Sequence, residues 1–326
     1  MSSTLTRWFN SQIDPLTKKP LNEVAKLHPE QAAVEYPFPL FDHKQMLLET
    51  FNNSCPEKIS IGENIQSKKP QNSQATIPKQ IKNLVAIYSA KGGVGKSTLT
   101  HQIALLLAKH NLKVGILDAD IYGPNQTDLF SHNDKPEIDE GNFVPLKHQG
   151  VYWMSMGTLT TDPSTPVIWR GPMASRALKQ LLSQTKWPPL DYLLIDMPPG
   201  TGDIQLTVMK EVALASSMVI TTPSPLAYFD ACKGFEMMQK LDIHVGGWIN
   251  NMTHITCNHC QQVQSLHTAD RPLQLKQIPA QCEIPLLTGS NQDFSTPLTP
   301  FLFDFFFDLS KKENNRGRNI PKIVVQ

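Results

Sequence analysis

The sequence predicts an α/β protein with a mostly parallel sheet, preceded by a small N-terminal α+β domain. From residue 84 onward, short aliphatic runs alternate with helical stretches, which is the order of repeated β-α-β units. The aliphatic runs are nearly continuous, as in strands that are buried on both faces of a parallel sheet. The expected strands lie within 84–89, 113–120, 151–157, 191–200, 217–223 and 244–252, and the expected helices include 97–110 and 173–184.

Composition divides the chain into four predicted parts. Residues 1–66 are polar with scattered apolar clusters, and we expect them to form the small N-terminal domain with one helix near 43–52. Residues 67–80 have the low hydrophobicity and the prolines of a linker. Residues 81–310 are expected to form the main domain, and residues 311–326 a flexible tail.

The bulk composition argues against two kinds of partner. Hydrophobic residues make up 40% of the 326 and charged residues 18%, with a net charge of +1 and no run of five like charges. We therefore expect neither a nucleic-acid nor a membrane partner. The N-terminus lacks the apolar stretch of a signal peptide, so a cytoplasmic location is expected. The apolar segment "FLFDFFFDL" (301–309) predicts a terminal helix packed on the sheet, since a membrane-surface helix would need basic residues.

The segment "SAKGGVGKST" (89–98) has the composition of a phosphate-binding loop and lies between a predicted strand and a predicted helix. Glycine tolerates the backbone angles that let N–H groups wrap phosphate oxygens, and the helix N-terminus adds partial positive charge. Lys96 would reach the β- and γ-phosphates, and the Ser97 hydroxyl would ligate Mg²⁺. The full set expected to contact the nucleotide is Lys91, Gly92, Gly93, Val94, Gly95, Lys96, Ser97 and Thr98.

Three aspartates follow apolar strands near this loop. Asp118 and Asp120 end the strand after the loop helix, at the edge where ligands of open α/β sheets bind. Asp196 follows four apolar residues, the arrangement that holds Mg²⁺ through water in nucleotide hydrolases. The segment 198–202, "PPGTG", is expected to be a mobile loop that senses the γ-phosphate.

The loop resembles the deviant Walker A motif of the SIMIBI-class ATPases, because Lys91 precedes the paired glycines. This class includes nitrogenase iron protein, the septum-site and plasmid-partition ATPases, and cluster carriers. The resemblance implies that Lys91 crosses a homodimer interface to the partner's nucleotide, while Lys96 acts within its own chain. Ala90 stands where the usual motif begins with glycine, which this class tolerates.

Further segments resemble the Mrp/ApbC-type iron–sulfur cluster carriers: "GILDADIYGPN", "WRGPMASRAL", "WPPLDYLLIDMPPGTGDIQLT" and "INNMTHITCNHC". The resemblance covers roughly residues 80–260. It implies a homodimer with ATP and Mg²⁺ at each loop and a [4Fe–4S] cluster bridged by Cys257 and Cys260 of both subunits. It also implies that the N-terminal domain, residues 1–66, is a divergent version of the MIP18-type domain that this family often carries. The implied partners are a cluster scaffold and recipient apo-proteins.

The Cys257–Cys260 pair leaves alternatives open. Position 261 is glutamine, which excludes attachment of a c-type haem, and a redox dithiol would require a thioredoxin-like context. A zinc site could recruit His254, His259 or His267. The remaining cysteines have no paired spacing: Cys232 and Cys282 are expected to be structural thiols, and Cys55 has no assigned role.

The resemblance also implies roles in a slow, Mg-dependent ATPase. Asp118 would hold the water shell of the metal, Asp120 would position the attacking water, and Asp196 would connect Mg²⁺ to the 198–202 loop. Asn251 would face the adenine. The alternative hypothesis is a positioning ATPase that binds DNA or membrane, with a structural zinc or thiol pair.

Overall fold

The computed structural model describes residues 2–68, 78–120, 123, 126–130, 135–159, 171–257, 259–266, 270–286 and 294–311. The chain divides into two units, Met1–Ser67 and Lys68–Gln326. The expected tail lies outside the described residues apart from Lys311, and so do residues 69–77 of the expected linker.

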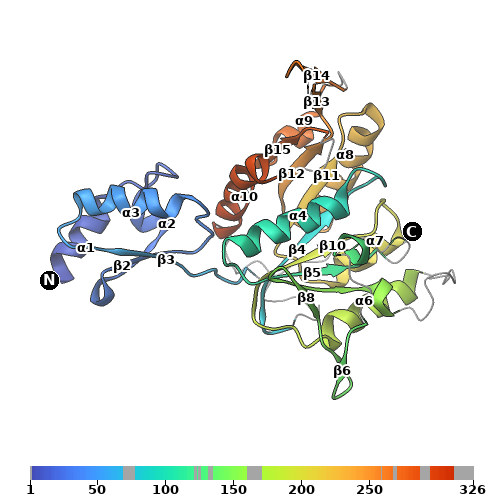
Figure 1. The fold of residues 1–326 in the computed structure, drawn as a ribbon, viewed down its shortest axis with the longest axis horizontal. Coiled ribbons are helices and arrows are strands. Elements are labelled where there is room, and N and C mark those ends of the chain that lie inside the picture. The colour runs from blue at the N-terminus through green and yellow to red at the C-terminus, as the bar shows by residue number, and fades with distance from the viewer. Residues whose placement is uncertain are drawn as a thin grey trace. The chain divides into compact units, whose positions relative to one another are not determined.

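The first unit is a small α+β domain (Figure 1). Strand β2 pairs antiparallel with β1 and parallel with β3. Helix α3 is the helix expected near residues 43–52. The elements are α1 Ser2–Ser11, α2 Leu21–Val24, β1 Lys26–His28, the 3-10 turn η1 Pro29–Gln31, β2 Ala33–Tyr36, α3 His43–Ser54 and β3 Ser60–Glu63.

A single core holds this unit together. The rings of Trp8 from α1 and Phe51 from α3 meet edge to face at 5.7 Å. Tyr36 is fully buried, and its hydroxyl donates a hydrogen bond of 2.6 Å to the buried carboxylate of Asp14. This bond satisfies the buried Tyr36 hydroxyl and Oδ1 of Asp14, while Oδ2 of Asp14 accepts a hydrogen bond of 2.7 Å from the N–H of Thr17.

The second unit contains an eight-stranded sheet in the order β15-β12-β11-β4-β10-β5-β9-β8. All neighbours pair in parallel except β8 and β9, so the prediction of a mostly parallel sheet is confirmed. Its strands are β4 Ile81–Tyr88, β5 Val114–Asp118, β8 Leu146–His148, β9 Val151–Ser155, β10 Leu190–Asp196, β11 Ser216–Thr221, β12 Val245–Asn251 and β15 Ala280–Ile284. Two separate hairpins are β6 Ile138–Asp139 with β7 Asn142–Phe143, and β13 His254–Thr256 with β14 Val263–Ser265.

Helices cover both faces of this sheet, which is why β5, β11 and β12 are buried along their whole length. Helix α10 packs on β15, β12 and α4, whereas α6 packs on α7 and α8 on α9. The helices are α4 Lys96–Lys109, α5 Gln126–Leu129, the 3-10 turn η2 Met156–Leu159, α6 Gly171–Gln184, α7 Asp203–Glu211, α8 Pro225–Lys240, α9 Leu273–Lys276 and α10 Ser295–Ser310.

Helix α10 confirms the terminal helix expected at residues 301–309. Phe301 and Phe305 lie against β12, where a Cβ on Gly247 would be 2.7 Å from the Phe301 ring. The absence of side chains at Gly246 and Gly247 therefore lets the aromatic rings approach the sheet. Among the described residues, no helix has the length and apolarity that a membrane crossing requires.

Candidate functional site

The loop at residues 89–95 joins β4 to α4, as the sequence predicts. Gly95 is the N-cap of α4 and has φ of +85°, a conformation that glycine favours. A Cβ on Gly95 would also lie 2.5 Å from Nδ2 of Asn251, so both conformation and space require glycine. The loop backbone thus turns directly into a helix N-terminus, the arrangement that binds phosphate.

Asn251 ends β12 and holds this loop from the side. Its side chain is 7% exposed, and its Nδ2 donates a hydrogen bond of 2.9 Å to the carbonyl of Val94. The described contact of Asn251 is therefore with the loop backbone. Contact with adenine stays a prediction.

Two buried carboxylates lie beside the loop, at the ends of neighbouring strands. Asp118 of β5 and Asp196 of β10 are register partners, and neither is exposed to solvent. The Lys96 ammonium forms a buried ion pair with Oδ1 of Asp196 and lies 3.3 Å from the Ser97 hydroxyl. The structure thus brings together four residues that the sequence assigned to phosphate and magnesium.

Burial and the nearby Asp196 carboxylate raise the pKa of Asp118, while the Lys96 charge lowers it less strongly. Two adjacent carboxylates out of water repel each other, and one ammonium compensates them only in part. A further positive charge at this point would favour the ionised form of Asp118. The donor set therefore fits a hard divalent cation such as Mg²⁺.

Gln126, the first residue of α5, is a site residue that the sequence did not indicate. It is fully buried, and its Nε2 donates 3.0 Å hydrogen bonds to Oδ2 of Asp196 and to the carbonyl of Ser97. Its backbone N–H lies 3.3 Å from Oδ2 of Asp118. Its other side-chain atom, Oε1, is buried beside the His101 imidazole, whose pKa is lowered by burial and raised by a hydrogen bond to Gln126.

Ser155, at the end of β9, was also missed. Its hydroxyl donates a hydrogen bond of 3.0 Å to Oδ2 of Asp118, its register partner on β5. The rule that identified Asp118 could have found it, because Ser155 is likewise a polar residue at the carboxyl end of a buried strand.

The other predicted residues surround this cluster. Asp120 accepts a hydrogen bond of 3.2 Å from the N–H of Gly123. In the 198–202 loop, the N–H of Gly200 donates a 3.0 Å bond to the carbonyl of Ser89, which joins that loop to the start of the phosphate loop. Thr98 is half-buried in α4, and the exposed members of the set are Lys91, Gly92 and Gly93.

Cys257 and Cys260 lie between the strands of the β13–β14 hairpin, which follows β12. Both cysteines are exposed. Cys257 and Gln262 are joined by a backbone hydrogen bond of 2.9 Å, and a second one of the same length runs from the N–H of Gln261 to the Cys257 carbonyl. Backbone N–H groups of Cys260 and His259 lower the pKa of the Cys257 thiol. The hairpin therefore presents a solvent-accessible sulfur biased toward the thiolate, the form that binds metals.

No group of three or more potential metal ligands occurs among the described residues. Neither His254 nor His259 is therefore grouped with both cysteines in the described part of the chain, and His267 lies outside it. Within the described chain, the hairpin contributes two sulfur donors without a third ligand.

The remaining cysteines differ from this pair. Cys282 is buried in β15, where burial raises its pKa, and its thiol donates to the carbonyl of Pro297 at 3.3 Å. Burial also raises the pKa of Cys232. Both observations agree with the expected structural thiols.

The glycine loop at the start of α4, the buried Lys96 and the paired strand-end carboxylates define a P-loop nucleotide-binding protein of the α/β class. The family model described as "NUBPL iron-transfer P-loop NTPase", in the ParA group, matches residues 80–295. The chain belongs to this family, as the resemblance to the Mrp/ApbC-type carriers predicts.

Proteins with similar sequences support this family assignment. The iron–sulfur cluster carrier protein of Pseudomonas fragi is 48% identical over 227 residues, covering 68% of this chain and 78% of that protein. That of Escherichia coli K12 is 45% identical over 202 residues, 61% of this chain and 54% of the relative, about half its length. A solved nucleotide-binding protein from Archaeoglobus fulgidus in complex with ADP has a TM-score of 0.55 and 29% identity, covering 72% of this chain and 90% of that one.

Proposed function

We propose that this protein binds ATP with Mg²⁺, forms a homodimer, and carries a [4Fe–4S] cluster between the Cys257 and Cys260 pairs of two copies for delivery to apo-proteins. The hydrogen bond between Asn251 and Val94 is the main support. It joins the phosphate loop to the end of β12, and β12 leads directly into the cysteine hairpin. A change in the loop could therefore reach the cysteines through this hydrogen bond and the short stretch of chain that follows Asn251.

The described side chains fit the nucleotide and its metal. Lys96 would exchange its ion pair with Asp196 for the β- and γ-phosphates, leaving two buried carboxylates beside the Ser97 hydroxyl. When bound, Mg²⁺ would supply charge neutralisation to the phosphates and to these carboxylates. Asp196, Asp118 and Ser97 would hold it, directly or through water.

Hydrolysis follows from the same residues. Asp120 would orient the attacking water, and Lys91 of one copy would reach the nucleotide of the other. The bond between Gly200 and Ser89 would transmit the loss of the γ-phosphate to the 198–202 loop. Turnover is expected to be slow, because P-loop switches are slow until a partner completes their site.

The cysteine hairpin suits a cargo that must be released. A [4Fe–4S] cluster takes four thiolates, and the described hairpin provides two, so a twofold pair of hairpins completes the set. Recipient apo-proteins would then take the cluster from an open site between chains. A positioning ATPase would share the loop but would leave this exposed pair without a role.

Anaerobic reconstitution with iron and sulfide tests the cargo. Wild type should hold one cluster per dimer, whereas Cys257→Ala/Cys260→Ala should hold at least tenfold less while retaining ATP binding. The matched control is Cys55→Ala/Cys232→Ala, which removes two other thiols. Equal loading of the two double variants would refute the bridged site.

Sedimentation with and without ATP tests the dimer. Lys91 is exposed and belongs to the phosphate loop, so Lys91→Ala should abolish ATP-dependent association without affecting the fold. The exposed Lys44→Ala is the control. If Lys91→Ala still associates with ATP as the wild type does, Lys91 does not contact the nucleotide of the partner copy.

A further inference from the structure

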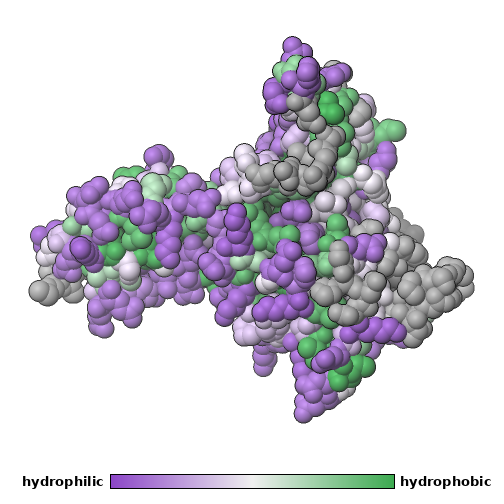
Figure 2. All heavy atoms as spheres, viewed as in Figure 1, coloured by the Kyte–Doolittle hydropathy of each residue, from purple (hydrophilic) through white to green (hydrophobic). Residues whose placement is uncertain are grey.

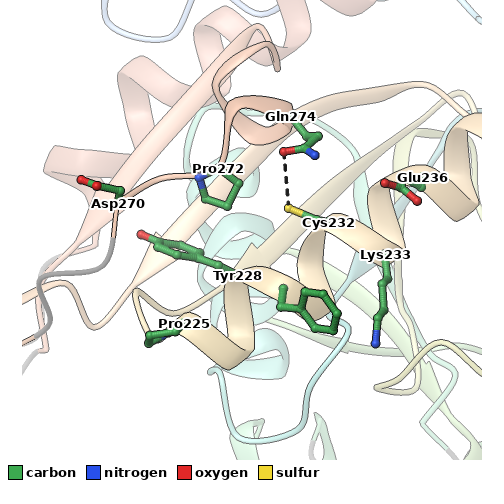
Figure 3. A pocket seen from close by; sticks show the side chains of 9 residues that line it. Pro225, Tyr228, Cys232, Lys233, Glu236, Asp270, Pro272 and Gln274 are labelled. Carbon is green, nitrogen blue, oxygen red and sulfur yellow. Dashed lines mark hydrogen bonds between the residues drawn. The ribbon is translucent and has the colours of Figure 1, made fainter.

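An open groove lies between α8 and the segment that leads into α9 (Figure 3). Its volume is about 580 Å³, and Pro225, Tyr228, Phe229 and Cys232 of α8 line one side while Asp270, Pro272 and Gln274 line the other. Cys232 and Gln274 face each other across it, with 4.0 Å between Sγ and Oε1. We call this the α8–α9 groove.

The apolar side chain of Phe229 lines the α8–α9 groove, and Leu226 and Leu273 are chain neighbours of residues that line it. Leu226 is 67% exposed, Phe229 60% and Leu273 72%. Hydrophobic surface is visible over α8 in Figure 2. Scattered apolar residues on a surface are normal, but three beside one cavity indicate a surface that another molecule covers.

The charged residues of the groove indicate which kind of partner would bind there. Glu236 and Asp270 line it, and neither forms an ion pair with another described residue. The one ammonium, of Lys233, already lies 4.1 Å from the centre of the Phe229 ring and 3.7 Å from Oδ1 of Asp230. The groove therefore carries an excess of negative charge beside an apolar rim, which suits a segment with apolar and basic side chains.

The groove is also close in the chain to the cysteine hairpin. Asp270 and Pro272 belong to the connection from β14 to α9, and Figure 1 shows α9 beside β13 at that end of the sheet. Cys232 would not compete for iron there, because burial and the nearby Glu236 raise the pKa of its thiol.

We propose that the α8–α9 groove is the docking site of the protein that receives the cluster, which inserts an apolar side chain beside Phe229 and places Lys or Arg next to Glu236 and Asp270. This inference rests on the proposed carrier function. In this proposal the hairpin binds the cluster, and the α8–α9 groove recognises the protein that receives it.

Two variants probe the groove, each with a matched control. Phe229→Glu removes the apolar anchor, and Ile138→Glu makes the same change at a 70% exposed site on β6. Glu236→Lys/Asp270→Lys reverses the groove charge, and Glu23→Lys/Glu49→Lys reverses two exposed carboxylates of the first unit.

The probe is apo-aconitase, whose regained activity reports the clusters it receives. With loaded wild-type carrier, the transfer rate should saturate with acceptor concentration. Both groove variants should raise the half-saturating concentration at least tenfold, and the controls less than twofold. Cluster loss to a small chelator, which needs no docking, should be unchanged. Transfer that does not saturate, groove variants that equal their controls, or an equal change in chelator loss would each overturn the proposal.

A second measurement separates docking from carriage. Fluorescently labelled apo-aconitase should bind the empty Cys257→Ala/Cys260→Ala carrier, more weakly as salt rises, and the groove substitutions should weaken this binding at least tenfold. If wild type fails to take up a cluster while this binding persists, the carrier function is wrong and the docking site remains. If the groove variants instead lose self-association, the face is an interface between copies and the proposal fails.

Discussion

The phosphate loop and the cysteine hairpin are built in opposite ways. Lys96 is 6% exposed and its partners Asp118 and Asp196 are fully buried, whereas Cys257 and Cys260 are exposed. The described polar groups around the loop bond to side chains from several strands. The hairpin is held by main-chain bonds between its own strands and by one from the N–H of Leu286 to the carbonyl of His254.

Because of this difference in burial, we expect substitutions at the two sites to affect ligand binding and protein stability to different degrees. A buried ion pair that loses one partner leaves an uncompensated charge, so substitutions at the phosphate loop should disturb the fold as well as binding. Exposed cysteines have little packing to lose, so substitutions there should affect binding alone. One chain supplies most of the residues expected at the phosphate loop, whereas the hairpin of one chain supplies two sulfur donors.

The largest effect is expected for Lys96→Met. It should weaken ATP binding by about 100-fold or more, because the phosphates lose their lysine, and it should destabilise the protein by about 3 kcal/mol, because Asp196 is left unpaired. Isothermal titration and urea unfolding measure the two effects. Adding Asp196→Asn should restore most of the stability but not the binding. If the double variant is as unstable as the single one, the charge pair is not the cause.

Gly95→Ala should have the next largest effect. Its φ of +85° and the Asn251 amide 2.5 Å from an added Cβ both oppose a side chain, so we expect a loss of about 2 kcal/mol or more and impaired nucleotide binding. Gly92→Ala is the control, because a Cβ there meets nothing within 4 Å, and thermal unfolding should differ from wild type by less than about 0.5 kcal/mol. Equal losses would show that loop glycines act together rather than through Asn251.

Gln126→Leu should cost about 1–2 kcal/mol, because the buried Asp196 oxygen and the Ser97 carbonyl each lose a donor. The increase in ATP affinity on adding Mg²⁺ should also shrink, whereas metal-free affinity should change little. The exposed Gln180→Leu on α6 is the control. If Mg²⁺ increases the ATP affinity of Gln126→Leu as much as that of the wild type, Gln126 has a structural role only.

The contrast between Asp196 and Gln126 also shows how far the sequence could predict the site. Asp118, Asp196 and the glycine loop were found because each follows an apolar strand, which is a local pattern. Gln126 reaches Asp196 across 70 positions of the chain. Its role depends on which carboxylate lies beside it, and no local pattern specifies that neighbour.

The fold, like the site, was predicted where the pattern in the sequence is local and missed elsewhere. Alternating apolar runs predicted the strands β4, β5, β9, β10, β11 and β12, and the buried parallel sheet followed from their continuity. The edge strand β15 was missed, because buried and exposed residues alternate along it and it has no aliphatic run. The antiparallel edge strand β8 and the short β13–β14 hairpin were not predicted, because strands of three residues carry too little periodicity. The sequence predicted that Asn251 faces the adenine, which stays a prediction, whereas its bond to Val94 depends on the three-dimensional position of β12.

The smallest effect is expected at the hairpin, as a shift in the pH at which Cys257 reacts. Its lowered pKa means that the thiolate persists to lower pH, so alkylation by iodoacetamide should reach half its maximal rate below the usual range of a thiol, about pH 8.5. Mass spectrometry of the metal-free protein measures this midpoint. His259→Pro should raise it, because proline removes one of the N–H groups that stabilise the sulfur. His259→Ala keeps that N–H and should leave the midpoint where it is; if alanine shifts it as far as proline does, the imidazole rather than the backbone sets the reactivity of Cys257.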